Sequence, residues 1–245
     1  MSGGRGRGSR WLVLGELSAQ VEGAGPPVVL LHGNSEDGSV FDKMAPHLAG
    51  FTLIRLDSRG HGATPRGRRP LTIKQLAIDT ARALADFPAP PGGFGVIGFS
   101  DGANIALELA IHRPRLVAAQ VLMGGNVTPK SLKPASNAAI LAAYGLVRAL
   151  GLASPAARRQ ADVLGLMVGQ PCVSPAQLAA VRVATLVMVG RRDVVPRRES
   201  RRVAGLIPGA EWVELAGQGH MLPRSAPVLA ARLAADFLGP RLGAG

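Results

Sequence analysis

The chain contains little cysteine and few aromatic residues. Cys172 is the single cysteine among 245 residues, so no disulfide can form within the chain and nothing requires an oxidising compartment. Aromatic residues make up 4% of the sequence, and no basic run is interleaved with them, so a surface that stacks nucleic-acid bases is not expected. The five histidines are scattered, and the spacings C-x-x-C and H-E-x-x-H do not occur. We therefore expect neither a metal ion nor another cofactor.

Acidic residues are scarce relative to basic ones. Lysine and arginine number 28 against 16 aspartates and glutamates, which gives a formal net charge of +12 at pH 7. A positive field favours anionic partners, including nucleic acid and membrane phosphates. A GC-rich coding bias would also enrich arginine together with alanine and glycine. We therefore interpret the charge as a solvated basic surface and keep nucleic-acid binding as the alternative.

Long hydrophobic runs are missing as well. No segment carries 18 or more strongly apolar residues, and the uncharged stretch at 134–147 is interrupted by Ser136, Asn137 and Gly145. Residues 1–10 are rich in glycine and arginine and are predicted to form a disordered basic tail. The apolar stretch that follows them is too short for a signal peptide. We expect a cytoplasmic protein without stable membrane insertion.

Apolar strand-like runs alternate with helical patterns along most of the chain. This order predicts an α/β protein with a mostly parallel central sheet flanked by helices. Between 126 and 181 the alternation stops, and helix starts occur near 137, 154 and 174. We therefore expect a core formed by 11–125 and 182–240, with a small helical lid inserted at 126–181. Within the core, the pattern predicts helices over 41–48, 72–87 and 223–238, among others.

The most informative stretch is Gly98-Phe99-Ser100-Asp101-Gly102. A short apolar run precedes it, as expected for a buried parallel strand, and a run of good helix formers follows it. Strand, tight turn and helix form the context in which G-x-S-x-G is a nucleophile elbow, with the serine hydroxyl projecting from the end of the sheet. Ser100 is therefore the predicted nucleophile.

A serine hydroxyl needs an adjacent base, and the base needs an acid that orients it. In hydrolases with this elbow the chain order is serine, acid, histidine. Asp193 follows the predicted strand 184–189, and His220 follows the predicted strand 211–215. The spacing predicts that Asp193 is the acid and His220 the base, because both follow strand ends from which their side chains can converge on the hydroxyl.

These motifs together resemble the α/β-hydrolase superfamily across residues 28 to 220. The resemblance rests on Leu31-His32-Gly33-Asn34, Asp57-Ser58-Arg59-Gly60-His61-Gly62, the elbow, the Gly-x-x-Asp-x-x-x-Pro segment at 190–196 and the terminal Gly-His. It implies the same triad of Ser100, Asp193 and His220, and it points to the backbone N–H of Asn34 as one oxyanion donor. The residue after the nucleophile supplies the other donor, so the backbone N–H of Asp101 is expected there. We assign the Asp101 side chain to the helix dipole.

The helical insertion is expected to cover an apolar substrate pocket. Its lining is predicted to include Phe99, Tyr144, Met167 and Met221. Three arginines at 66, 68 and 69 follow a strand end, so an anionic substrate is an alternative.

The expected function is a serine hydrolase that cleaves small carboxylic esters, lactones or thioesters through an acyl-enzyme intermediate. The same triad can also serve an acyltransferase, a carbon–carbon bond hydrolase or a cofactor-free peroxidase. A ligand-binding protein of this fold with slow turnover is a further alternative.

Overall fold

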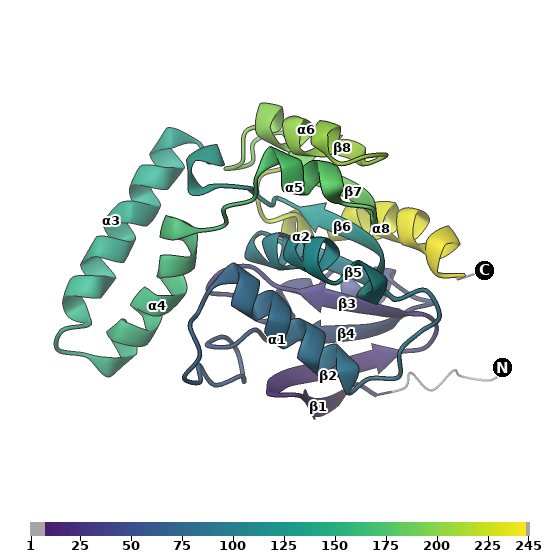
Figure 1. The fold of residues 1–245 in the computed structure, drawn as a ribbon, viewed down its shortest axis with the longest axis horizontal. Helices are drawn as coiled ribbons and strands as arrows, with labels where there is room; N and C mark the ends of the chain where they lie inside the picture. The colour runs from purple at the N-terminus through teal and green to yellow at the C-terminus, as the bar shows by residue number, and fades with distance from the viewer. Residues whose placement is uncertain (1–7, 244–245) are drawn as a thin grey trace.

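An eight-stranded sheet forms the centre of the protein (Figure 1). The computed structural model describes residues 8–243, and the strands lie in the order β1-β2-β4-β3-β5-β6-β7-β8. The pairs β1–β2 and β2–β4 are antiparallel, and every other neighbouring pair is parallel. This confirms the predicted mostly parallel sheet. The strands are β1 (Arg10–Leu14), β2 (Leu17–Gly23), β3 (Pro27–Leu31), β4 (Thr52–Leu56), β5 (Phe94–Phe99), β6 (Val117–Met123), β7 (Ala184–Gly190) and β8 (Glu211–Leu215).

Both faces of the sheet are buried under helices or short turns. Along β3, Val29 and Leu31 pack into one core cluster, whereas Val28 and Leu30 pack into a second one on the other face. Two buried faces explain why the inner strands are continuous apolar runs. The helices are α1 (Ile73–Ala85), α2 (Asp101–His112), α3 (Pro134–Leu150), α4 (Pro155–Gly169), α5 (Pro175–Ala180), α6 (Arg197–Leu206), α7 (Leu222–Ser225) and α8 (Pro227–Leu242), with 3₁₀ turns η1 (Gly38–Phe41), η2 (Ala45–His47), η3 (Pro114–Leu116) and η4 (Pro129–Ser131).

Several predicted elements need correction. The helix expected over 41–48 is replaced by the turns η1 and η2. The Asp37 carboxylate caps the first turn at Ser39 N, and Pro46 lacks the N–H that a continuous helix would need. The helix expected over 223–238 is divided into α7 and α8 before Pro227. By contrast, α1 begins after Thr72, whose hydroxyl accepts from Gln75 N as a helix cap.

The predicted insertion contains three α-helices. Along the chain, α3, α4 and α5 come after β6 and before β7, and α3 begins at Pro134, three residues before the helix start expected near 137. The division into core and lid stays a prediction. The predicted tail is too long by at least one residue, because Arg10 already pairs with Val21 in the sheet. The first seven residues of that tail lie outside the described part of the chain.

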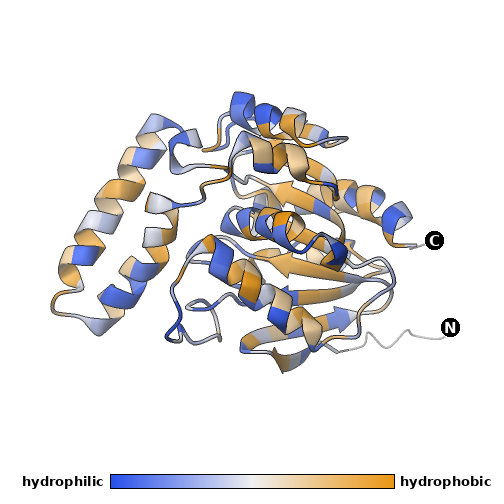
Figure 2. Cartoon of the chain, in the orientation of Figure 1, coloured by the Kyte–Doolittle hydropathy of each residue, from blue (hydrophilic) through white to orange (hydrophobic). Residues whose placement is uncertain are grey.

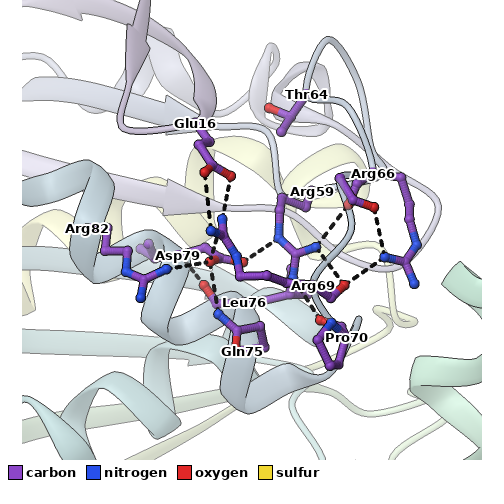
Figure 3. A network of polar contacts seen from close by, with 12 residues as sticks. Glu16, Arg59, Thr64, Arg66, Arg69, Pro70, Gln75, Leu76, Asp79 and Arg82 are labelled. Carbon is purple, nitrogen blue, oxygen red and sulfur yellow. Dashed lines mark hydrogen bonds and ion pairs between the residues drawn. The ribbon is translucent and has the colours of Figure 1, made fainter.

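A buried ion pair ties the loop after β4 to α1 (Figure 3). Arg59 Nε lies 2.5 Å from Asp79 Oδ2, and the two side chains are 1% and 2% exposed. The remaining guanidinium N–H groups donate to the carbonyls of Arg66, Arg69 and Pro70. Arg69 in turn pairs with Asp79 and with Glu16, which lies in the turn between β1 and β2. Since its guanidinium is almost fully used inside the protein, Arg59 acts as an internal clamp for residues 59–70.

We expect Asp79→Asn to lower the free energy of unfolding by about 3 kcal/mol, because it leaves the Arg59 cation buried without a carboxylate. Urea denaturation followed by circular dichroism measures this change. Asp236→Asn is the matched control, since the Asp236 carboxylate is 69% exposed and pairs only loosely with Arg232, at 3.7 Å. Equal losses in the two variants would contradict the structural role assigned to the clamp.

Candidate active site

Ser100 occupies a sharp turn between β5 and α2. Its backbone has φ 55° and ψ −118°, a conformation that L residues rarely adopt. The turn is possible because glycines flank it at positions 98 and 102. A β-carbon at Gly98 would overlap the Gly102 backbone, and one at Gly102 would overlap the carbonyl of Leu31. The close approach of strand and helix therefore directs the serine hydroxyl away from the end of the strand.

The structure brings Ser100, His220 and Asp193 into one hydrogen-bonded chain. His220 Nε2 lies 3.1 Å from Ser100 Oγ, and His220 Nδ1 lies 2.7 Å from Asp193 Oδ1. Asp193 follows β7 and is 1% exposed, and its Oδ1 also accepts from Val195 N at 3.0 Å. The imidazole follows β8 and packs against the Phe99 ring at 5.1 Å between centroids. In this arrangement the carboxylate orients the imidazole, and the imidazole can accept the serine proton.

Gly124 leaves the space that the imidazole and carboxylate occupy. It follows β6 with φ +62°, and a β-carbon there would lie 2.9 Å from Cε1 of His220, 3.0 Å from its Nδ1 and 3.2 Å from Asp193 Oδ2. Any larger residue at this position would push on both partners of the Nδ1 hydrogen bond.

For Gly124→Ala we predict a fall in kcat of about tenfold, because a displacement of the imidazole by a few tenths of an ångström disturbs its alignment with the serine hydroxyl. KM should change much less. Gly205→Ala on α6 is the control, since a β-carbon there meets nothing within 4 Å. An unchanged kcat in Gly124→Ala would mean that the imidazole is not held where the structure has it.

The loop after β3 passes close to the turn that carries Ser100. A β-carbon at Gly33 would lie 3.1 Å from Ser100 Cβ, so the backbone of residues 33–34 runs next to the serine side chain. Asp101 is the first residue of α2, and the N–H groups of a first helical turn have no partner within the helix. These placements are compatible with the two backbone N–H groups expected to stabilise an oxyanion, those of Asn34 and Asp101.

The Asp101 side chain, which we assigned to the helix dipole, lies in the first turn of α2 and also lines the site. Its carboxylate is 6% exposed and accepts from Asn34 Nδ2 at 3.0 Å and, more weakly, from Asn104 Nδ2 at 3.4 Å. Burial raises the pKa of Asp101 above its usual range.

Asn34 links the start of α2 to α4. Its Nδ2 donates to Asp101 and also to the carbonyl of Val163, at 2.7 Å. The neighbouring Ser35 hydroxyl donates to Asn34 Oδ1 and accepts from Gln160 Nε2, also on α4. The loop that carries the expected oxyanion donor is thus held by the helix above it.

A mostly apolar cavity of about 360 Å³ opens at the serine. Met167 lines it as expected, and Phe99 lies behind the imidazole, where it is fully buried. Tyr144 and Met221 do not line it. Tyr144 lies further along α3 in a different groove, between α3 and α4, and Met221 packs against the second core cluster. The predicted site residues Ser100, Asp101, Met167 and His220 are part of the lining. The rest of the lining consists of Gly124, Asn126, Leu132, Ser136, Ala139, Ile140 and Val194.

Two of the three arginines that suggested an anionic substrate are already paired. Arg66 binds Asp162 on α4 at 2.9 Å, and Arg69 binds Glu16 and Asp79. Because their charges are compensated, they do not favour an anionic substrate. Within residues 8–243 no group of three or more histidine, cysteine, aspartate or glutamate side chains is placed to hold a metal ion. In the same part of the chain, no helix combines the length and apolar character of a bilayer-spanning segment.

His32 has a structural position beneath the loop. Its Nε2 accepts from Ser58 N at 2.9 Å, so the proton of the neutral ring lies on Nδ1, which donates to the Gly33 carbonyl at 2.8 Å. Burial, with a smaller contribution from nearby His61, lowers the pKa of His32 to about 4. The ring is therefore neutral near pH 7, and it holds the strand ends rather than the substrate.

This lowered pKa predicts an acid-sensitive fold. Between the ordinary histidine pKa of 6.5 and the folded value of about 4, the unfolded chain binds a proton that the folded chain excludes. The neutral His32 ring therefore leaves the free energy of unfolding undiminished above pH 6.5. As the pH falls from 6.5 toward about 4, the free energy of unfolding decreases by about 3 kcal/mol. His32→Gln should flatten the dependence of the unfolding free energy on pH over this range, measured by urea denaturation. The exposed His47, changed to Gln, should leave the dependence intact; equal slopes in the two variants would contradict the assignment.

The geometry defines an α/β protein with a serine, histidine and aspartate chain at the carboxyl end of a parallel sheet. A model of the alpha/beta hydrolase fold family matches residues 26–150, just over half of the chain, and the protein belongs to that family. The match includes Asn34 and Ser100, whereas Asp193 and His220 lie beyond it.

Curated relatives match a similar share of the chain. A pyrrolizixenacetamide deacetylase of Xenorhabdus hominickii is 28% identical over 48% of this chain and 44% of its own length. A pimeloyl-[acyl-carrier protein] methyl ester esterase of Methylococcus capsulatus is 34% identical over 46% of this chain and 42% of its own. The chain thus matches less than half the length of these relatives. A solved esterase structure from Thermogutta terrifontis covers 96% of this chain and 99% of that one, with a TM-score of 0.77 at 21% identity, which shows the shared fold.

Proposed function

We propose that the protein is a serine hydrolase that cleaves small carboxylic esters, lactones or thioesters through an acyl-enzyme intermediate. The observation that carries the proposal is the pair of contacts made by the His220 imidazole, 3.1 Å to Ser100 Oγ and 2.7 Å to Asp193 Oδ1. A base that touches the nucleophile on one side and a buried acid on the other is the arrangement that acyl transfer needs.

The reaction begins with attack of Ser100 Oγ on the substrate carbonyl carbon while His220 Nε2 takes the hydroxyl proton. The carbonyl oxygen becomes an oxyanion, which the backbone N–H groups of Asn34 and Asp101 stabilise. Asp193 stabilises the imidazolium that has formed. His220 then gives the proton to the leaving oxygen or sulfur, the bond to the leaving group breaks, and Ser100 carries the acyl group.

Water completes the cycle by the same steps. His220 removes a proton from a water molecule, the resulting hydroxide attacks the acyl carbonyl, and the serine oxygen leaves with the proton that the imidazole returns. The products are a carboxylic acid and free enzyme.

The cavity favours substrates whose acyl or alcohol groups are small and uncharged. Its walls include apolar side chains from the loop after β7 and from α3 and α4, and none of its lining residues is an arginine or a lysine. A volume of about 360 Å³ lies near the lower end of the range for small-molecule pockets. The free, exposed Cys172 needs no oxidising environment, which supports the proposed cytoplasmic location.

Ser100→Ala is expected to reduce kcat for p-nitrophenyl esters at least about 1,000-fold, because no other group can form the acyl-enzyme. A panel of esters with increasing acyl length measures this, and thermal unfolding checks that the variant stays folded. Ser225→Ala, at an exposed position on α7, is the matched control and should keep full activity. Hydrolysis that persists undiminished in Ser100→Ala would overturn the proposed nucleophile.

A further inference from the structure

Helix α3 is largely apolar, yet none of its side chains is buried. Of its 17 residues, Pro134–Leu150, only Arg148 carries a charge. A helix of this composition is normally enclosed by the protein. Here Leu146 is 63% exposed, Leu150 is 55% exposed and Leu152, in the turn that follows, is 87% exposed.

The arrangement of the α3–α4 hairpin, residues 134–169, explains this exposure. The hairpin projects from one side of the sheet, on the left in Figure 1, and α3 packs along α4. Helix α4 contributes the buried side chains Ala161, Val163 and Leu166, whereas α3 contributes none. In Figure 2 orange segments alternate with pale and blue ones along α3. The far end of the hairpin therefore presents leucines to the surroundings.

Cationic side chains surround this apolar end. Arg148, Arg158 and Arg159 are all exposed. Arg158 is held at the turn by hydrogen bonds from Nε and Nη2 to the Gly151 carbonyl. The single acid of the hairpin, Asp162, is paired with Arg66. The end of the hairpin is thus aliphatic and positively charged at once.

We propose that the far end of the α3–α4 hairpin binds the surface of a bilayer rich in anionic phospholipid. Leu146, Leu150 and Leu152 enter the boundary between headgroups and acyl chains, and the three arginines bind lipid phosphates. Apolar side chains flanked by basic ones are the combination that holds amphipathic helices in this interface. The helix lies in the surface and does not cross the bilayer.

Two other occupants fit the observations less well. Protein interfaces need directional polar contacts, about one hydrogen bond per 100–200 Å², and the exposed part of α3 between Leu141 and Leu150 offers alanine, glycine and leucine besides Arg148. A second copy packed on the same surface by two-fold symmetry would bring the same three arginines together without an opposing acid. A lipid surface needs no directional partner and supplies the anions.

The proposal also gives the active-site cavity a position relative to the lipid. Ala139 and Ile140 on α3 and Met167 on α4 line that cavity. The hairpin that would touch the bilayer therefore also forms part of the wall of the pocket.

The test is flotation of the protein with vesicles, using the Ser100→Ala variant so that the outcome does not depend on catalysis. Vesicles with equal parts of phosphatidylcholine and phosphatidylglycerol should carry the protein, and pure phosphatidylcholine vesicles should carry much less. Binding to the anionic vesicles should weaken as salt is added, because the arginine contacts are screened.

Matched variants test whether the leucines and arginines of the α3–α4 hairpin form the lipid-binding surface. Leu146→Gln with Leu150→Gln should weaken vesicle binding about tenfold or more. Val228→Gln with Leu229→Gln removes two comparably exposed residues, 58% and 49%, from α8 and should leave binding unchanged. Arg148→Gln with Arg159→Gln should weaken binding more than Arg198→Gln with Arg232→Gln, although both pairs remove the same charge.

Three results would overturn the proposal: no flotation with anionic vesicles, equal loss in the α3 and α8 variants, or dimerisation through the same leucines. Analytical ultracentrifugation without vesicles detects the last of these. Because every readout is binding, failure here leaves the proposed hydrolase activity untouched, and inactivity on esters leaves the lipid-binding result standing.

Discussion

The strained turn at Ser100 is the constraint on which the proposed chemistry depends. Its positive φ is maintained by packing, since β5, α2 and the end of β3 approach so closely that Gly98 and Gly102 admit no β-carbon. The buried sheet on one side and α2 on the other leave the serine hydroxyl one direction in which to point. The folded core therefore holds a local conformation that an isolated peptide would not adopt.

The other two side chains reach the hydroxyl because parallel strands end at a common edge. Strands β5, β6, β7 and β8 are neighbours, and Ser100, Gly124, Asp193 and His220 each follow one of them in turn. The residue after β6 has no side chain, so the imidazole from β8 and the carboxylate from β7 can meet across it. The alternation of buried strands and helices thus brings residues more than 100 positions apart to hydrogen-bonding distance.

The features of the fold and the site that depend on residues close together in the sequence were predictable from it. The alternation of apolar residues and the composition identified the parallel strands and the helix over 72–87, and the strand–turn–helix context selected Ser100. The turns η1 and η2 were mistaken for a helix because the Asp37 cap and Pro46 stabilise shorter turns than the apolar pattern of 41–48 suggests. The cavity lining was predicted only in part, since it depends on how α3 and α4 pack: Ile140 faces the serine, and Tyr144, one turn later, does not. The buried position of the Asp101 carboxylate depends on Asn34, a contact across 67 positions that no local pattern encodes.

Covalent trapping tests the central claim most directly. Reaction with a fluorophosphonate, followed by peptide mass spectrometry, reports which hydroxyl is activated by a neighbouring base. The account predicts a single phosphonylated residue, Ser100, with labelling that is strongly slowed in His220→Gln. Labelling at another serine, or equal labelling rates with and without the imidazole, would contradict it.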